Sequence, residues 1–289
     1  MAKKRYRKEK DSLGEVKIPF NALWGAQTQR AVNNFPISGI KMDFPFTNSF
    51  VDSLGIIKDA AAKANKSLGL LPVRKANAIS RAAKEVWQSK HNDHFPLDVF
   101  QTGSGTSSNM NANEVIANLA SKYSGIDIDP NDDVNMSQSS NDVIPTAIKI
   151  SASMDLTKKL YPALDKLILT IDKKAQSLEG LVKTGRTHLM DAMPIDFSQE
   201  LSGWSSQLKN SKETLVFLEK RLDEMPLGGT AIGTGVNAHP RFPKLFAKEL
   251  SKLSGGTCKV VPSNNFFHEL SAQDNAVQVS GELKNLAII

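Results

Sequence analysis

The sequence predicts an all-α fold built from long helices. Apolar residues recur every three or four positions along several segments, which places them on one face of a helix. One such run, over residues 197–222, is longer than the usual helix of a globular protein and favours a helix bundle. The chain shows neither a strand-rich region nor an internal repeat.

Composition predicts a globular protein of about two domains. Hydrophobic residues make up 40% of the 289 positions and charged residues 23%. No window of about 18 residues is continuously apolar, so we expect no transmembrane helix. Cys258 is the single cysteine, which excludes an internal disulfide bond and suits a reducing compartment.

Residues 1–12 predict a disordered basic tail. They carry six Lys or Arg and two Asp or Glu, so they supply most of the net charge of +6. Because the excess charge lies in one short segment, the sequence does not favour a nucleic-acid partner. The tail has no apolar segment typical of a secretory signal, and its acidic residues argue against a transit peptide. We therefore predict a cytoplasmic location and no membrane partner.

The next part of the chain predicts irregular structure followed by two helices. Residues 13–46 contain three prolines and no clear period, with one short helix expected near 27–33. Helical spacing begins at residue 47 and runs to 68. A second helix is expected over 73–90.

His91, Asp93 and His94 follow that second helix closely enough to suggest a metal site. Spacing alone is weak support, since histidines in a loop are more often solvated. We therefore predict no metal.

The segment Gln101–Asn113, QTGSGTSSNMNAN, predicts a polar loop that opens a helix. Gly103 and Gly105 would let a ligand approach the backbone closely, and the neighbouring hydroxyls are hydrogen-bond donors. A nucleotide-binding loop is disfavoured because no Lys follows the glycines and no strand precedes them. A capped turn without a ligand remains an alternative.

The segment Asn131–Pro145, NDDVNMSQSSNDVIP, predicts a second polar loop before a helix. Ser139, Ser140, Asn141 and Asp142 are all suited to cap a helix N-terminus. Pro145 would fall in the first turn, where proline is tolerated. Free N–H groups and partial positive charge at a helix start favour an anion, such as a carboxylate or phosphate.

Two further polar loops follow an apolar stripe that predicts a helix over 160–178. Thr184–Pro194 is expected to be a polar turn that leads into the long helix of 197–222. Pro226–Gly235 is a Gly- and Thr-rich loop before a helix near 243–253, and a final helical pattern starts near 264.

Capping explains any one of these loops, but four loops of similar chemistry suggest a common site. Helix N-termini that converge would form a cluster of uncharged hydrogen-bond donors. Such a cluster suits a small polyanion, and especially negative charge that develops during a reaction.

The four loops, over residues 103–113, 131–145, 185–194 and 227–240, strongly resemble class II fumarase of the aspartase/fumarase superfamily. Trp24–Arg30, WGAQTQR, resembles the N-terminal region of that family. The resemblance implies a helical fold with an N-terminal domain over 13–145 and a long-helix domain over 146–289. It also implies a homotetramer with active sites where three subunits meet.

The reaction implied by the resemblance is the reversible hydration of fumarate to L-malate, through an aci-carboxylate and without a cofactor. His188 would be the catalytic acid/base residue. The residues implied to bind substrate are Ser104, Gly105, Thr106, Ser139, Ser140, Asn141 and Thr187. A structural histidine is the alternative for His188, and in aspartase the matching position is typically not histidine.

The family's second anion site corresponds here to Asp129, Pro130, Asn131 and Asp132. The family has His at the first of these positions. Because Asp129 would repel a dicarboxylate, we expect the second site to be weakened or lost.

The chain reaches Ile289 within a helical pattern, so we expect it to be truncated inside a helix. The family's serine base and the glutamate that pairs with His188 would lie beyond that point, which predicts little activity for these 289 residues alone. The alternatives are an ammonia lyase of the aspartase type, or an inactive lyase fold with a structural or interaction role.

Overall fold

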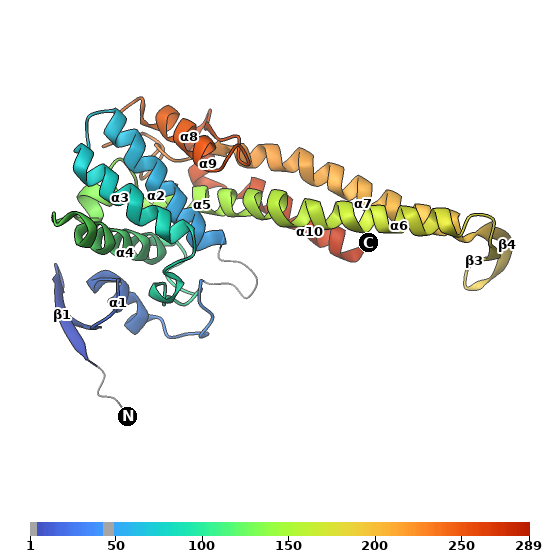
Figure 1. Ribbon diagram of the computed structural model, residues 1–289, viewed down its shortest axis with the longest axis horizontal. Coiled ribbons are helices and arrows are strands. Elements are labelled where there is room, and N and C mark those ends of the chain that lie inside the picture. The colour runs from blue at the N-terminus through green and yellow to red at the C-terminus, as the bar shows by residue number, and fades with distance from the viewer. Residues whose placement is uncertain (1–4, 43–48) are drawn as a thin grey trace. The chain divides into compact units, whose positions relative to one another are not determined.

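The computed structural model describes residues 5–42 and 49–289. These residues divide into two compact units (Figure 1). Unit 1 comprises Met1–Ala152 and Asp223–Gln273, and unit 2 comprises Ser153–Leu222 and Asp274–Ile289. The predicted boundary at 145/146 therefore differs from the structure, because a segment distant in sequence completes the core of unit 1.

Unit 1 is a cluster of helices with two short sheets. Helices α2, α3 and α4 pack in succession, and α8 packs against α2. The bounds of its helices are α1 Ala26–Asn34, α2 Ser49–Ser67, α3 Val73–Trp87, α4 Thr106–Ser124, α8 Phe242–Leu253 and α9 Phe266–Ser271, with short turns η1 Asn92–His94 and η2 Pro130–Val134. Helix α5, Ser140–Asp155, starts in this unit. The core is largely Ala, Ile and Leu, so the helices can approach closely.

Unit 2 contains a long pair of helices, α6 Tyr161–Ser177 and α7 Phe197–Glu219, which lie side by side (Figure 1). The short helices η3 Leu156–Leu160 and η4 Lys220–Asp223 flank this pair, and α10, Asp274–Ile288, packs against α7. Asp172 of α6 accepts hydrogen bonds from Ser205 Oγ at 2.5 Å and from Lys209 Nζ at 2.9 Å, both of α7.

Within residues 5–42 and 49–289, three two-stranded sheets accompany the helices. Strand β1, Tyr6–Asp11, is antiparallel to β2, Gly14–Pro19. Strand β3, Val182–Thr187, is antiparallel to β4, Met190–Asp196. The third sheet pairs β5, Glu224–Met225, with β6, Val261–Pro262.

The predicted all-α class is confirmed, since the sheets are small and helices form both cores. The helices predicted over 27–33, 47–68, 73–90 and 160–178 correspond to α1, α2, α3 and α6, although the proposed start at residue 47 lies outside the described residues. The helix expected from residue 264 is divided into α9 and α10.

Two predictions about local structure are wrong. Residues 6–11 are not a disordered tail but strand β1, where Arg7 donates to the carbonyl oxygens of Ala22 and Trp24. The segment 184–194 is not a simple turn but most of the β3–β4 hairpin. In both places short polar strands pair locally, and composition alone did not reveal their partners.

Among residues 5–42 and 49–289, no helix is both long enough and apolar enough to span a membrane.

Candidate functional site

The first polar loop presents hydroxyl groups at the start of α4. Gly105 precedes the helix with a φ of +70°, a left-handed conformation that favours glycine. An added Cβ atom there would lie 2.6 Å from Cγ1 of Ile144, so the loop packs directly against α5. The exposed side chains of Ser104 and Thr106 lie side by side, with 3.1 Å between their hydroxyl oxygens.

The second polar loop forms the capped start of α5. The Ser139 carbonyl accepts the first helical hydrogen bond from Val143 N–H, and Ser139 Oγ accepts from Asn141 N–H at 3.3 Å. In return, the Asp142 carboxylate accepts from Ser139 N–H at 2.9 Å. Pro145 is the sixth residue of α5 rather than part of its first turn, so the predicted position of this proline is wrong.

The fourth loop, Pro226–Gly235, is hydrogen-bonded to the start of α5. Asn141 Nδ2 donates to the carbonyl oxygen of Ala231 at 2.8 Å. The buried carboxylate of Asp142 also accepts from the N–H groups of Gly228 at 3.0 Å and Thr230 at 2.9 Å. Burial raises the pKa of Asp142 to about 7, against the effect of these hydrogen bonds. Three of the four polar loops therefore meet within unit 1.

A buried lysine lies beneath these loops. Lys58, on α2, is completely buried, and its ammonium group donates to Asn109 Oδ1, Asn135 Oδ1 and Gln138 Oε1 at 2.8, 2.8 and 2.9 Å. Asn109 Nδ2 in turn donates to Ser140 Oγ at 3.0 Å. This network connects the core of unit 1 to the first turn of α5.

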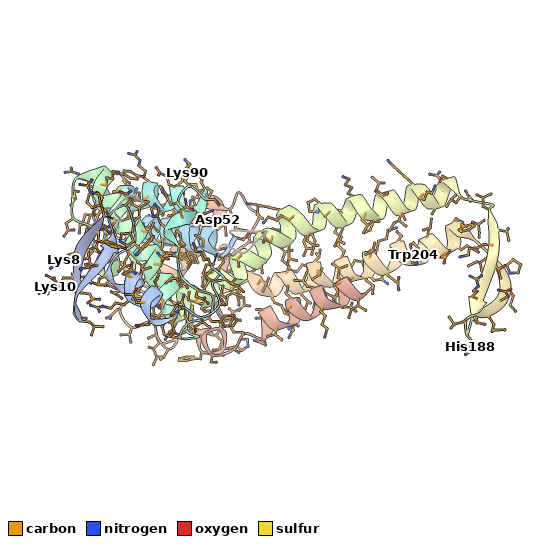
Figure 2. The ribbon with its side chains drawn as sticks, turned by 90° about the horizontal axis from the view of Figure 1, so that it is seen from below. Lys8, Lys10, Asp52, Lys90, His188 and Trp204 are labelled. Carbon is orange, nitrogen blue, oxygen red and sulfur yellow. The ribbon has the colours of Figure 1, made fainter. Side chains whose placement is uncertain are left out.

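The third loop is the tip of the β3–β4 hairpin in unit 2. Thr187 pairs with Met190, so His188 and Leu189 form a two-residue turn with φ values of +51° and +62°. Figure 2 shows His188 at the tip of this hairpin, with its side chain exposed. The prediction that this loop opens a helix is wrong, because α7 begins only at Phe197.

The hairpin also contains an irregularity beside the predicted residues. The strand register shifts between Thr184 and Arg186, and an added Cβ atom at Gly185 would lie 2.6 Å from the carbonyl oxygen of Met193. A glycine is therefore required at this bulge, which directs the chain toward His188.

The predicted second anion site is occupied by a side chain of the protein itself. Asp129 caps η2, and its carboxylate accepts from the N–H groups of Asn131 at 2.7 Å and Asp132 at 2.8 Å. Arg30 lines a cavity together with Asp129 and Asn131. Its guanidinium group donates to the Asp11 carboxylate in two hydrogen bonds of 2.8 Å. The N–H donors that would receive an anion are thus already engaged.

The histidines after α3 serve the local structure. His91 Nε2 lies 3.0 Å from Glu85 Oε2, which also accepts from Tyr123 OH at 2.7 Å. His94 Nδ1 accepts from Leu23 N–H at 3.3 Å, and burial lowers the pKa of His94. Across the described parts of the chain, no three His, Cys, Asp or Glu side chains are grouped so as to hold a metal ion.

Sequence reasoning placed Asn109 and Gln138 in the polar loops but assigned them no role, and it missed Lys58. One signal was present: Lys58 interrupts the apolar stretch GIIKDAAA, in a helix whose residues are buried nearly all round. A charged residue in such a position needs hydrogen-bond partners.

Comparison with known proteins places these observations in a family. Residues 14–289 match the family model described as "Lyase". The chain belongs to this lyase family. It is 52% identical to the class II fumarate hydratase of Xylella fastidiosa (strain Temecula1) over 98% of the chain, and 50% identical to class II fumarate hydratase 2 of Pseudomonas aeruginosa, also over 98%.

The fold comparison agrees with the sequence comparison. The structure matches the crystal structure of class II fumarase from Schistosoma mansoni with a TM-score of 0.94 and 35% identity, over 98% of this chain and 63% of that one. The chain spans 59% and 60% of the length of the two bacterial relatives. The resemblance to class II fumarase is confirmed.

Proposed function

We propose that the protein containing this chain catalyses the reversible hydration of fumarate to L-malate. The observation that supports this most directly is the meeting of two hydroxyl-rich helix starts in unit 1. Ser104 and Thr106 lie at the start of α4, which packs against the start of α5 with Ser139, Ser140 and Asn141. Uncharged donors at helix N-termini suit a dicarboxylate and the added negative charge of an aci-carboxylate.

In this proposal Ser104, Gly105, Thr106, Ser139, Ser140, Asn141 and Thr187 bind the substrate carboxylates. His188 holds the water and acts as the acid/base residue, since histidine is the side chain that most often serves as a general acid or base in catalysis. Abstraction of a proton from the carbon beside a carboxylate creates additional negative charge. The helix starts supply the groups that stabilise this charge. The second anion site at Asp129–Asp132 is not used, because Asp129 occupies its donors.

We further propose that copies of the protein assemble as a homotetramer, in which different copies contribute residues to one site. Thr187 and His188 belong to unit 2, whereas the other proposed substrate-binding residues belong to unit 1. Unit 2 carries many exposed apolar side chains, namely Leu167, Leu169, Leu181, Val182, Leu189, Met190, Met193, Phe197, Trp204, Val216, Phe217, Val277, Leu283, Ile288 and Ile289. Such a concentration of apolar surface is typical of a protein–protein interface.

Absorbance assays of malate dehydration to fumarate test the function. We expect turnover by the complete protein, with at least a tenfold rise in KM for Ser139→Ala, which removes a hydroxyl at the anion site. We expect little turnover by these 289 residues alone, which span 59% of the Xylella fastidiosa relative. Ammonia release from aspartate, measured in parallel, would instead favour an ammonia lyase, and inactivity toward both substrates would favour a structural role.

We propose a cytoplasmic protein, which cell fractionation with an antibody against the chain would test.

A further inference from the structure

Lys58 is a buried cation with a complete set of hydrogen bonds. Its ammonium group has three N–H donors and no acceptor, and its three partners are the amide oxygens of Asn109, Asn135 and Gln138. Its exposed fraction is 0%, so no water replaces these bonds. The ammonium group therefore determines which end of each amide faces it.

The orientation of Asn109 has a consequence for Ser140. Because Asn109 Oδ1 accepts from Lys58, the Nδ2 group is left to donate to the other neighbours of this side chain. It donates to Ser140 Oγ at 3.0 Å and to Asn135 Oδ1 at 3.2 Å. Because the Ser140 hydroxyl accepts a hydrogen bond from Asn109, its own hydrogen remains available for another acceptor. Ser140 is thereby prepared to donate to an anion at the start of α5.

We infer that Lys58 is a positioning residue for the proposed dicarboxylate site: through Asn109 it orders the hydrogen bonds so that the Ser140 hydroxyl donates to the substrate carboxylate. This inference rests on the proposed function for its substrate. It does not rest on contact between Lys58 and the substrate, since Lys58 reaches Ser140 only through Asn109.

The Asp142 carboxylate lies close to this network. Asp142 lies in the same first turn of α5 as Ser140, and its carboxylate is held by the N–H groups of Ser139, Gly228 and Thr230. Burial lowers the pKa of Lys58 to about 7, and the charge of Asp142 opposes that shift.

The test uses the complete protein and two variants of the network. Lys58→Met removes the charge and the donors at similar length. Asn109→Asp keeps the size of the side chain and can pair with Lys58, but it offers Ser140 an acceptor in place of a donor. Both variants are expected to raise the dissociation constant for fumarate roughly tenfold or more, the equivalent of one lost hydrogen bond to a charged group.

The chain offers a matched control in the exposed pair of Lys66 and Asn77, where Lys66 Nζ donates to Asn77 Oδ1 at 3.1 Å. Lys66→Met and Asn77→Asp should leave fumarate binding unchanged. If Lys58→Met does not fold, Asn109→Asp decides the question, because its carboxylate compensates the charge of Lys58.

A double-mutant cycle separates this role from general stability. In a Ser140→Ala background, Asn109→Asp should change fumarate binding less than about twofold, since the hydroxyl that it redirects is absent. An equal loss of binding with and without Ser140 would overturn the inference, even if the wild type hydrates fumarate.

A neutron structure tests the same inference without any substrate. The expected result is three deuterons on Lys58 Nζ and an Asn109 Nδ2 deuteron directed at Ser140 Oγ. A Ser140 deuteron directed at Asn109 would contradict it. A wild-type protein that shows the expected order but neither binds nor hydrates fumarate would overturn the proposed function instead.

Discussion

At the scale of single residues, the backbone at His188 limits which side chains the hairpin can accept. His188 and Leu189 both adopt left-handed φ values, which strain most side chains, and Leu189 is 96% exposed. A strained turn that holds a histidine at an exposed tip is consistent with a position selected for chemistry rather than for stability.

His188→Asn should preserve the turn and remove the imidazole that we propose as the acid/base group. Asparagine tolerates the left-handed conformation and is frequent in two-residue turns of this kind, so the thermal midpoint should be unchanged. We expect kcat for malate dehydration to fall by about two orders of magnitude or more, as is usual when an acid/base residue is lost. Steady-state kinetics with circular dichroism as the folding control measure both effects, and normal kcat in His188→Asn would refute the assigned role.

Asp98 supports a prediction about acid stability. Partial burial acts to raise its pKa, but hydrogen bonds from the N–H groups of Phe100, Ser38 and Gly39 lower it to about 2. Because this pKa is below that of the unfolded chain, the stabilisation is fully present above about pH 4 and is lost as pH falls toward 2.

Asp98→Asn should therefore lower the thermal midpoint at pH 6 but have little effect near pH 2. Unfolding followed by circular dichroism at a series of pH values measures the difference between the two proteins. A difference that stays constant from pH 6 to pH 2 would show that the ionised carboxylate is not the source of the stabilisation.

At the scale of elements, helix α1 depends on a carboxylate from another helix. Glu114, in the middle of α4, accepts from the N–H groups of Gly25, Gln27 and Thr28 at 2.8, 2.9 and 3.1 Å. These are the donors that the helix leaves unpaired at its start, and the negative charge suits that end of the helix. The cap joins the Trp24–Arg30 segment to the helix that begins at Thr106.

Glu114→Gln keeps the size of the side chain but removes the charge and one acceptor oxygen. We expect the free energy of unfolding to fall by about 1–3 kcal/mol. Hydrogen exchange should accelerate at the amides of Gly25, Gln27 and Thr28 more than in α3. Glu15→Gln, which breaks only the exposed ion pair with Lys8, is the matched control. Equal protection of the three amides in both variants would contradict the capping role.

The helices could be predicted from sequence because each has its own apolar period, as α3 and α6 show. The hairpin could not, since the turn at His188 and Leu189 contains none of the Gly or Asn residues that usually identify such a turn. The hydrogen-bond network around Lys58 could not be predicted either, because its three amide partners are at least 51 residues from Lys58 in sequence and only folding brings them together.

At the scale of the whole molecule, the distribution of apolar surface predicts association. The exposed apolar side chains of unit 2 come mainly from α6, α7, α10 and the β3–β4 hairpin. They include Trp204, labelled in Figure 2, which is 53% exposed. Removing apolar area from water stabilises an interface by about 25 cal/mol per Å². Copies of the protein should therefore bury these residues against one another.

Trp204→Glu places a charge among these side chains and should shift the complete protein from the proposed tetramer toward smaller species in sedimentation velocity experiments. Phe20→Glu is the matched control, because Phe20 is an aromatic residue of unit 1 that is also 53% exposed. Because different copies contribute to the site in the proposed assembly, malate dehydration should decline in parallel with the proposed tetramer. Full activity in a dissociated Trp204→Glu variant would mean that one copy of the chain brings its two units into a working site unaided.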